Sequence, residues 1–280
     1  MRQVINGYHQ TRLSFDPRRD IVWKSLWRFH FCKLISPDDC VLDLGCGYGD
    51  FINNVIARRR IAVDSWEDFP NYIDPDVERV VGSVTDLDFI EEGVVDFAFS
   101  SNLFEHLSRD DFARVLDILR VKLTADGTLN ILQPNYRYAY REYFDDYTHI
   151  SIFSHISIAD FLKTNGYDLL EIRPRFLPLT VKSRLPISPW LIKAYLASPI
   201  KPLAKQMLIR ARVSDNHRQE GGASGYGGRG AAHLLARRRL ARTQQHRHPS
   251  ADRGVMSWTM DRQEAALIPW VGPEGRLHGR

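Results

Sequence analysis

The stretch Val41-Leu-Asp-Leu-Gly-Cys-Gly-Tyr-Gly-Asp50 decides the fold of this chain. A short apolar strand runs into three closely spaced glycines, and we expect a helix from Asp50 to Arg59 after them. Glycines let the backbone approach a ligand closely, and the first N–H groups of a helix are unpaired and attract polar groups. The stretch therefore predicts a strand, a loop and a helix that together hold a nucleotide-like cofactor.

Strand and helix patterns alternate on the C-terminal side of this loop. Short apolar runs predict strands at 60–63, 79–81, 95–99, 127–132 and 168–172. Apolar residues at helical spacing predict helices at 110–122 and 157–165. This alternation is typical of a parallel sheet covered by helices. We therefore predict an α/β fold, a Rossmann-like three-layer α/β/α sheet.

The three glycines are not spaced as in dinucleotide-binding enzymes. They are Gly45, Gly47 and Gly49, whereas the dinucleotide fingerprint needs a glycine at the position of Asp50. The spacing resembles that of the class I S-adenosylmethionine-dependent methyltransferases. The alternative is a nicotinamide-dependent oxidoreductase on the same sheet, which Asp50 disfavours.

Other segments carry the same resemblance. Asp43 stands two residues before Gly45, as the acidic strand residue of that family does. Asp64 ends the second strand, where a family carboxylate accepts hydrogen bonds from the ribose hydroxyls. The segment Ser100-Ser-Asn-Leu-Phe-Glu-His-Leu107 is similar to the family segment beside the cofactor, and 123–131 is similar to its turn and fifth strand.

The resemblance implies that the chain is a methyltransferase with S-adenosylmethionine as its cofactor. Ser83 departs from the family pattern, because many members have an acidic residue there that binds the adenine amine. We expect Asp86 or Asp88 to take this role. The cofactor-binding residues that the resemblance implies are Asp43, Gly45, Cys46, Gly47, Gly49, Asp64, Asp86 and Asn102.

The segment from Gln133 to His149 follows the fifth strand and holds five tyrosines, Arg137, Arg141 and two adjacent aspartates. Ligands of open α/β sheets bind outside the carboxyl ends of the strands, so this loop is expected to overhang the methyl donor. Tyrosine rings stack on sugar rings, and carboxylates bind hydroxyls. The segment resembles methyltransferases of bacterial surface glycans and lipid-linked saccharides, which implies O-methylation of a saccharide or saccharide-lipid. A non-catalytic binding domain of this architecture is a further alternative.

Methyl transfer to a hydroxyl needs a base, and His is the commonest because its pKa lies near working pH. His149 is our first candidate, since a carboxylate of the neighbouring Asp145 or Asp146 could orient it, and the alternative is that His149 only caps the next segment. His106 and Asp146 are the next candidates for catalysis, and we expect His155 to be structural. The three cysteines form no C-x-x-C pair, so no structural zinc site is expected, and we assign no metal ligands.

The chain divides into four parts. They are an N-terminal helical segment (1–38), the cofactor-binding methyltransferase domain (39–175), a basic segment of amphipathic helices (176–212) and a tail rich in Arg and Gly (213–280). Helices are expected at 190–196 and 203–209, and their cations and aromatic residues suit peripheral contact with a membrane through 190–212. No apolar run reaches the roughly 18 residues that cross a bilayer, and the polar N-terminus is unlike a signal peptide, so we expect a cytoplasmic protein.

The tail has a composition of its own. It holds eleven Arg, no Lys and ten of the 18 Gly, whereas residues 1–212 are close to neutral. The basic total therefore comes from the tail, and we expect no nucleic-acid partner. The tail cannot bury enough apolar surface to offset its ordering entropy, which predicts disorder. Its composition suggests a frameshifted or read-through terminus, with a basic RNA- or membrane-binding tail as the alternative.

Overall fold

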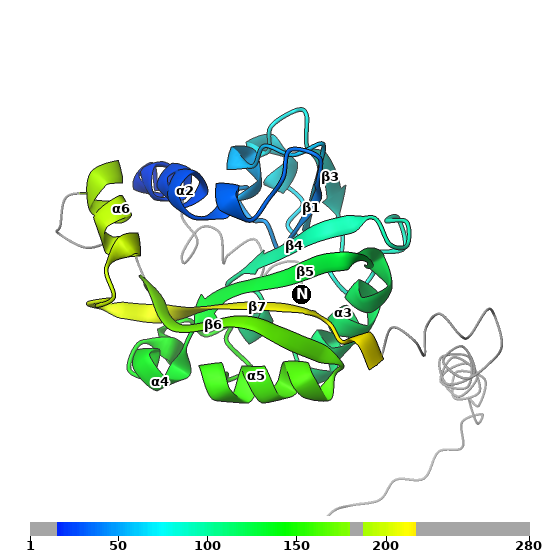
Figure 1. Cartoon of the computed structure of the whole chain (residues 1–280). Coiled ribbons are helices and arrows are strands. Elements are labelled where there is room, and N and C mark those ends of the chain that lie inside the picture. Colours follow the sequence, from blue (N-terminus) through cyan, green and yellow to red (C-terminus); the bar gives the residue numbers. More distant parts are fainter. Residues whose placement is uncertain (1–15, 180–186, 217–280) are drawn as a thin grey trace, which may run out of the picture. The chain divides into compact units, whose positions relative to one another are not determined.

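The computed structural model describes residues 16–179 and 187–216, which form one compact unit (Figure 1). Its strands lie in one seven-stranded sheet with the order β3-β2-β1-β4-β5-β7-β6. Their bounds are β1 Cys40–Leu44, β2 Arg59–Asp64, β3 Glu78–Val81, β4 Val95–Ser101, β5 Leu123–Pro134, β6 Tyr167–Pro178 and β7 Ala204–Val213. The first five strands run parallel, and β7 lies antiparallel between β5 and β6. The predicted α/β class is confirmed.

Helices cover both faces of the sheet, as the three-layer prediction requires (Figure 1). One apolar core joins the sheet to α3 and α5, and the other joins it to α2 and α6. The α-helices are α2 Arg18–Phe29, α3 Arg109–Lys122, α4 Tyr136–Ala139, α5 His155–Thr164 and α6 Pro189–Ala197. Short 3-10 turns stand between them at η1 Phe31–Lys33, η2 Ile52–Asn54, η3 Phe69–Tyr72, η4 Phe104–His106 and η5 Tyr143–Asp145.

Helix α3 forms where apolar residues at helical spacing predicted a helix at 110–122. Ser108 caps its N-terminus, because the Ser108 hydroxyl accepts a hydrogen bond from the Asp111 backbone N–H at 3.0 Å. Acidic residues in the first turn add a favourable interaction with the helix dipole. The buried stripe consists of Phe112, Val115, Leu116 and Leu119. Local sequence and core packing therefore agree on this helix.

The helix that we predicted from Asp50 to Arg59 does not form. Only the 3-10 turn η2 follows the glycine loop. The Asn54 side-chain amide donates to the Asp50 carbonyl at 2.9 Å, taking the acceptor that an α-helix would give to the Asn54 backbone N–H. The Asn54 N–H instead bonds the Phe51 carbonyl at 3.0 Å. The cofactor loop therefore ends in a compact turn without a helix N-terminus.

The helix that we predicted at 203–209 is also wrong, because this segment lies in strand β7. Met207, Leu208 and Ile209 are consecutive and fully buried, as in a strand with both faces covered. Ile209 pairs with Ile131 of β5 and with Ile172 of β6. An apolar run of this length fits either a helix or a strand, and only the open position beside β5 decides between them.

Strand β7 also moves the boundary that we placed at Val213. Val213 is buried, and the Ser214 backbone N–H donates to the Gly166 carbonyl at 2.9 Å. The sheet therefore draws on residues beyond 175 and beyond 212. The predictions for 217–280 fall outside the described residues. Within the described part of the chain, no helix has both the length and the apolar character needed to cross a membrane.

Candidate functional site

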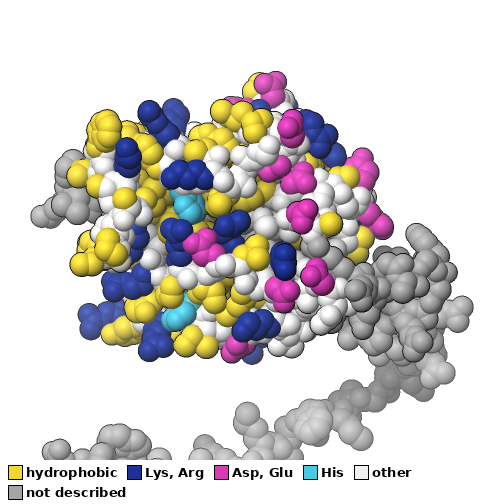
Figure 2. Space-filling view, viewed as in Figure 1, with side chains coloured by type: hydrophobic (Ala, Val, Ile, Leu, Met, Phe, Trp, Pro, Cys, Tyr) yellow, Lys and Arg dark blue, Asp and Glu magenta, His cyan; other side chains and the backbone are white. Residues whose placement is uncertain are grey.

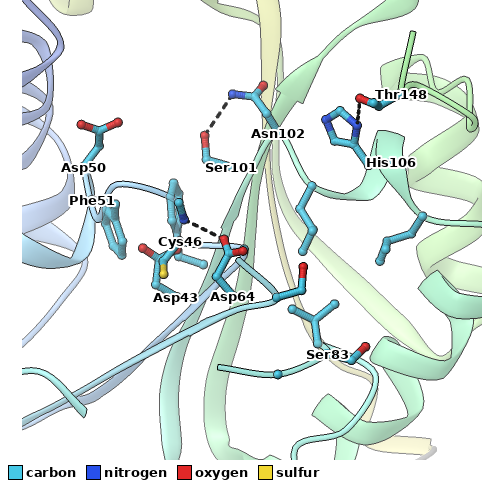
Figure 3. Close-up of a pocket in the computed structure, with 18 of the residues that line it drawn as sticks. Asp43, Cys46, Asp50, Phe51, Asp64, Ser83, Ser101, Asn102, His106 and Thr148 are labelled. Carbon is cyan, nitrogen blue, oxygen red and sulfur yellow. Dashed lines mark hydrogen bonds between the residues drawn. The ribbon is translucent and has the colours of Figure 1, made fainter. Parts of the chain in front are cut away.

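A cavity of about 300 Å³ opens at the carboxyl ends of the central strands. Asp43 of β1, Asp64 of β2 and Ser101 of β4 contribute to its walls (Figure 3). Parallel strands place the residues that follow them at one edge of the sheet, so the loops after β1, β2 and β4 meet there. Residues from α2 and from the loop before α5 complete the walls.

The glycine loop forms one side of the cavity. Gly45 and Gly47 have φ values of 67° and 52°, which lie in the region that L side chains rarely adopt. A Cβ on Gly45 would stand 2.9 Å from the Leu103 Cδ1 atom. Both glycines belong to the cavity wall. Their lack of a side chain is what keeps this side of the cavity open.

Asp64 fixes the loop to the end of β2. Its Oδ2 atom accepts a hydrogen bond from the Gly47 backbone N–H at 2.8 Å, and its Oδ1 atom accepts one from the Trp66 N–H at 2.9 Å. The carboxylate lines the cavity and keeps partial contact with solvent. A carboxylate oxygen can accept more than one hydrogen bond, so Asp64 retains acceptor capacity toward a ligand.

Asp43 lies beneath the loop and is only 2% exposed. Burial raises the pKa of its carboxyl well above the usual range, and the nearby carboxylates of Asp64 and Asp50 raise it further. The Asp43 carboxyl therefore holds a proton more readily than an exposed aspartate does, and its side chain lines the cavity.

The other expected cofactor residues divide into two groups. Cys46 and Asn102 are in the cavity wall, whereas Gly49 and Asp86 are not. Gly49 packs against Ile73, and Asp86 is exposed to solvent. Asn102 adopts a φ of 51°, and its Oδ1 atom accepts a hydrogen bond from the Gln206 Nε2 atom of β7 at 2.9 Å.

Helix α2 adds wall residues to which our sequence analysis gave no role. Arg19 forms an ion pair with Asp50, and both side chains line the cavity. Trp23, also in the wall, packs edge-on against Phe51 and Phe99. No sequence signal separates Arg19 from the other arginines, because its role depends on how α2 packs over the loop.

The opposite side of the cavity holds His106 and Thr148 (Figure 3). The Thr148 hydroxyl donates to the Asp146 Oδ1 atom at 2.6 Å and lies 2.9 Å from the His106 Nδ1 atom. Since the hydroxyl proton goes to Asp146, the His106 Nδ1 atom is the donor to Thr148. Burial, aided by the charge of His149, lowers the pKa of His106 to about 4, so its ring is neutral near pH 7.

His149 lies beside His106, and their ring centroids are 4.7 Å apart. The His149 Nδ1 atom donates to the Tyr143 backbone carbonyl at 2.6 Å. We predicted that a carboxylate orients the His149 ring, but the hydrogen bond of its Nδ1 atom goes to the Tyr143 backbone carbonyl. The Asp146 carboxylate instead reaches His106 through Thr148. His155 stands apart, and its Nδ1 atom accepts a hydrogen bond from the Asn135 amide at 3.0 Å.

Glu105 completes this group and is fully buried. Within residues 16–179 and 187–216, neither of its carboxylate oxygens has a hydrogen-bond partner. Its backbone carbonyl accepts hydrogen bonds from the N–H groups of Ile150 and Ser151, which ties the loop before α5 to η4. Burial raises the pKa of Glu105 to about 8, and Asp146 acts in the same direction. Its position next to His106 was the only sequence signal for Glu105.

Residues 19–172 match the family model described as a methyltransferase domain. The chain belongs to this methyltransferase family. The match spans more than half of the chain and includes the glycine loop, Asp64, the Glu105-His106 pair and His149. None of the curated protein sequences matches the chain.

Solved structures show the same fold. An S-adenosylmethionine-dependent methyltransferase from Archaeoglobus fulgidus is 20% identical, has a TM-score of 0.53 and is matched over 74% of this chain and 98% of that chain. A methyltransferase from Thermotoga maritima is 18% identical, has a TM-score of 0.54 and is matched over 75% of this chain and 95% of that chain. A methyltransferase from Clostridium acetobutylicum is 12% identical, has a TM-score of 0.50 and is matched over 76% of this chain and 98% of that chain.

The family decides between the alternatives that the glycine spacing left open. The protein is a methyltransferase, and S-adenosylmethionine is its cofactor. The cavity suits this molecule, because it combines a side-chain-free loop, a carboxylate at the end of β2 and an apolar wall that includes Trp23 and Val84. The nicotinamide-dependent alternative is rejected.

Proposed function

We propose that the methyltransferase transfers a methyl group to a hydroxyl of a saccharide or saccharide-lipid. The observation that carries the proposal is the two-sided cavity. Its glycine side is suited to the donor, while His106 and Thr148 line the other side. Transfer from a sulfonium is an in-line displacement, so the acceptor oxygen must approach the methyl carbon from the side opposite the sulfur. The His106 imidazole on that side, with His149 packed behind it, is where an acceptor hydroxyl can be activated.

We assign the donor to the glycine side of the cavity. Asp64 accepts hydrogen bonds from the ribose hydroxyls, and the loop of Gly45, Cys46 and Gly47 passes close to the cofactor. Gly49 keeps the loop in its turn, since any side chain there would meet Ile73. The remaining proposed donor residues are Asp43 and Asn102 in the cavity wall. Ser83 in the wall replaces Asp86 as the candidate for the adenine end, because Asp86 lies outside the wall.

The acceptor proposal rests on the loop between β5 and α5. Tyr140, Phe144 and Tyr147 are 53%, 54% and 61% exposed, although aromatic side chains usually seek burial. Exposed aromatic rings can stack on the apolar faces of sugars. Arg137 and Arg141 on the same loop offer hydrogen bonds to hydroxyl or acidic groups of a glycan.

A glycan panel with radiolabelled donor tests this proposal. His149→Ala is expected to reduce turnover by about 100- to 10,000-fold and to leave the donor Kd unchanged, because a group that activates the acceptor acts after donor binding. The matched control is His155→Ala, which removes a histidine that bonds Asn135 outside the cavity. Transfer to nitrogen or carbon acceptors alone, or full turnover by the His149 variant, would reject the proposal.

Peripheral membrane contact is the second part of the acceptor proposal. Trp190 and Leu191 of α6 and Ile200 after it are 75%, 53% and 74% exposed. Lys and Arg side chains are spread over the half of this face where α2, α4 and α6 lie, and most acidic side chains are on the other half (Figure 2). This combination suits an anionic lipid surface that carries a saccharide-lipid. Because 204–213 form the largely buried strand β7, we now confine the proposed membrane contact to 190–203 of the predicted segment 190–212.

Sedimentation with anionic liposomes tests the contact. We expect binding at low salt, weaker binding at high salt and a reduced effect in the double variant Trp190→Ala, Lys193→Ala. The control is Phe89→Ala, which removes an aromatic residue that is 40% exposed elsewhere on the molecule. Absence of binding at low salt would exclude the membrane contact and leave the hydroxyl acceptor to be tested separately.

A further inference from the structure

The side chains of Glu105, His106 and His149 converge on one point. Each offers one ligand atom, and these three atoms lie within 4.8 Å of one another. Two ligand atoms bound to one ion at about 2.1 Å each are no more than about 4.2 Å apart. Small movements of the three side chains would therefore be enough to bring their ligand atoms to coordination distance. The residues come from η4 and from the loop before α5, so only the tertiary structure brings them together.

The buried carboxylate is independent evidence that a ligand belongs here. Glu105 is fully buried, and neither of its oxygens has a hydrogen-bond partner among the described residues. A buried polar group without a partner costs free energy, and a buried charge costs more, unless an ion or another group compensates it. A divalent cation would supply the missing partner.

Both histidines are oriented as metal ligands are. The Nδ1 atom of His149 donates to the Tyr143 carbonyl, and the Nδ1 atom of His106 donates to Thr148, which in turn bonds Asp146. Metal-binding histidines almost always donate one ring N–H to a carbonyl or carboxylate, directly or through a polar group, and bind the ion with the other nitrogen. In both rings Nε2 is the nitrogen that would bind the ion.

We propose that Glu105, His106 and His149 form a divalent metal site at the acceptor side of the cofactor cavity. Two imidazoles and one carboxylate suit a first-row transition metal such as Zn²⁺ or Co²⁺ better than Mg²⁺, which prefers oxygen ligands. Three protein ligands leave coordination positions open. Since His106 is also in the cavity wall, the ion would stand at the edge of the cavity that holds the methyl donor.

The role of the site rests on the function proposed above. The metal binds the acceptor hydroxyl oxygen and lowers the pKa of the hydroxyl, so that its proton leaves to solvent. The oxygen then forms a bond to the methyl carbon of the donor, the bond between that carbon and sulfur breaks, and the sulfur keeps the electron pair. The products are the methyl ether and neutral S-adenosylhomocysteine. The histidines then act as metal ligands and do not accept the hydroxyl proton themselves.

Metal binding can be measured without activity. The full chain is stripped with a chelator and titrated with Co²⁺, whose visible spectrum reports nitrogen and oxygen ligands, and with Zn²⁺ in competition. We expect Glu105→Gln and His149→Gln each to weaken this site by at least 10-fold. The matched control is His30→Asn, since His30 is a largely buried histidine that lies outside the cluster and whose Nε2 atom has no hydrogen-bond partner among the described residues. Any Co²⁺ binding by the histidines at 217–280 is the same in the parent and in every variant, so it does not affect the comparison.

The outcomes separate this site from the function on which its role rests. Equal Co²⁺ affinity in the parent, Glu105→Gln and His149→Gln would overturn the metal site, even if the protein methylates a hydroxyl. Loss of the Co²⁺ spectrum in both variants supports the site, even if no hydroxyl acceptor is found. Thermal melts check that each variant is folded. Glu105→Asp is a second test, because it keeps the charge and is expected to retain weakened Co²⁺ binding.

Discussion

The two sides of the cavity are built in different ways. The donor side takes Asp43, Gly45, Gly47 and Asp64 from one continuous strand, loop and strand, and backbone hydrogen bonds hold its geometry. The acceptor side joins His106 to Thr148, which is 42 residues away in the sequence. The comparison teaches that a loop which binds through its backbone is visible in a local motif, whereas a cluster of side chains from distant segments is not.

The largest effect is expected from Gly47→Val. A β-branched residue at a φ of 52° is strained, and its side chain would enter the donor side of the cavity. We expect donor binding to fall below detection in calorimetric titration, while Co²⁺ binding on the acceptor side is retained. Gly93→Val is the matched control, because Gly93 has a φ of 64° and a Cβ added there would meet no atom within 4 Å. Equal loss of donor binding in both variants would contradict a local effect.

Asp64→Ala is expected to have the next largest effect. It removes the acceptor of the Gly47 and Trp66 N–H groups and the proposed acceptor of the ribose hydroxyls. Hydrogen bonds to a charged group contribute about 1.5–3 kcal/mol, so the donor Kd should rise by roughly 10- to 150-fold. Asp86→Ala is the control, since Asp86 is exposed and outside the cavity wall. A larger effect of Asp86→Ala than of Asp64→Ala would reverse our assignment.

Thr148→Val tests the positioning of His106. The change keeps the shape of the side chain but removes the hydroxyl that links His106 to Asp146. We expect turnover to fall by about 10- to 100-fold with no change in the donor Kd. Thr148→Ser should restore most of the turnover, because it returns the hydroxyl. Unchanged turnover in the Val variant would mean that the link does not position His106.

The smallest effect concerns a region outside the cavity. His30 packs against Phe176, and burial, aided by Arg173, lowers its pKa to about 4, while Arg210 and Lys33 act in the same direction and Glu171 opposes them. The unfolded state therefore binds more protons than the folded state below the ordinary His pKa of about 6.5. The contribution of neutral His30 to the free energy of unfolding is therefore complete above about pH 6.5 and is lost as the pH falls toward 4.

Thermal melts at about pH 7.5 and about pH 5 measure this contribution. We expect the melting temperature of the parent to fall more between the two conditions than that of His30→Asn. An equal fall in the two proteins would show that His30 does not contribute to the pH dependence. Donor and Co²⁺ affinities should be the same in both proteins, because His30 belongs to neither side of the cavity.

Two local patterns of the sequence were compatible with more than one structure, and our prediction was wrong for both. Asp50 to Arg59 lacks a glycine or proline that forbids a helix, but the Asn54 amide takes the carbonyl that the helix needs. Met207 to Ile209 fits a helix or a buried strand equally well as sequence. The choice between helix and turn in the first segment, and between helix and strand in the second, needs the three-dimensional structure. The local sequence does not determine the hydrogen-bond partners or the burial of these residues.

The sequence by itself determined where six of the seven strands and most of the helices lie along the chain, the glycine loop and the acidic residues Asp43 and Asp64. These features depend on periodicity and backbone conformation, which are local properties of the chain. Only the tertiary structure decided that β7 enters the sheet, that Arg19 of α2 lies against the cavity and that His106, Thr148 and Glu105 form one group. Such contacts join residues far apart in sequence, and they form because the parallel sheet brings its loops together at one edge.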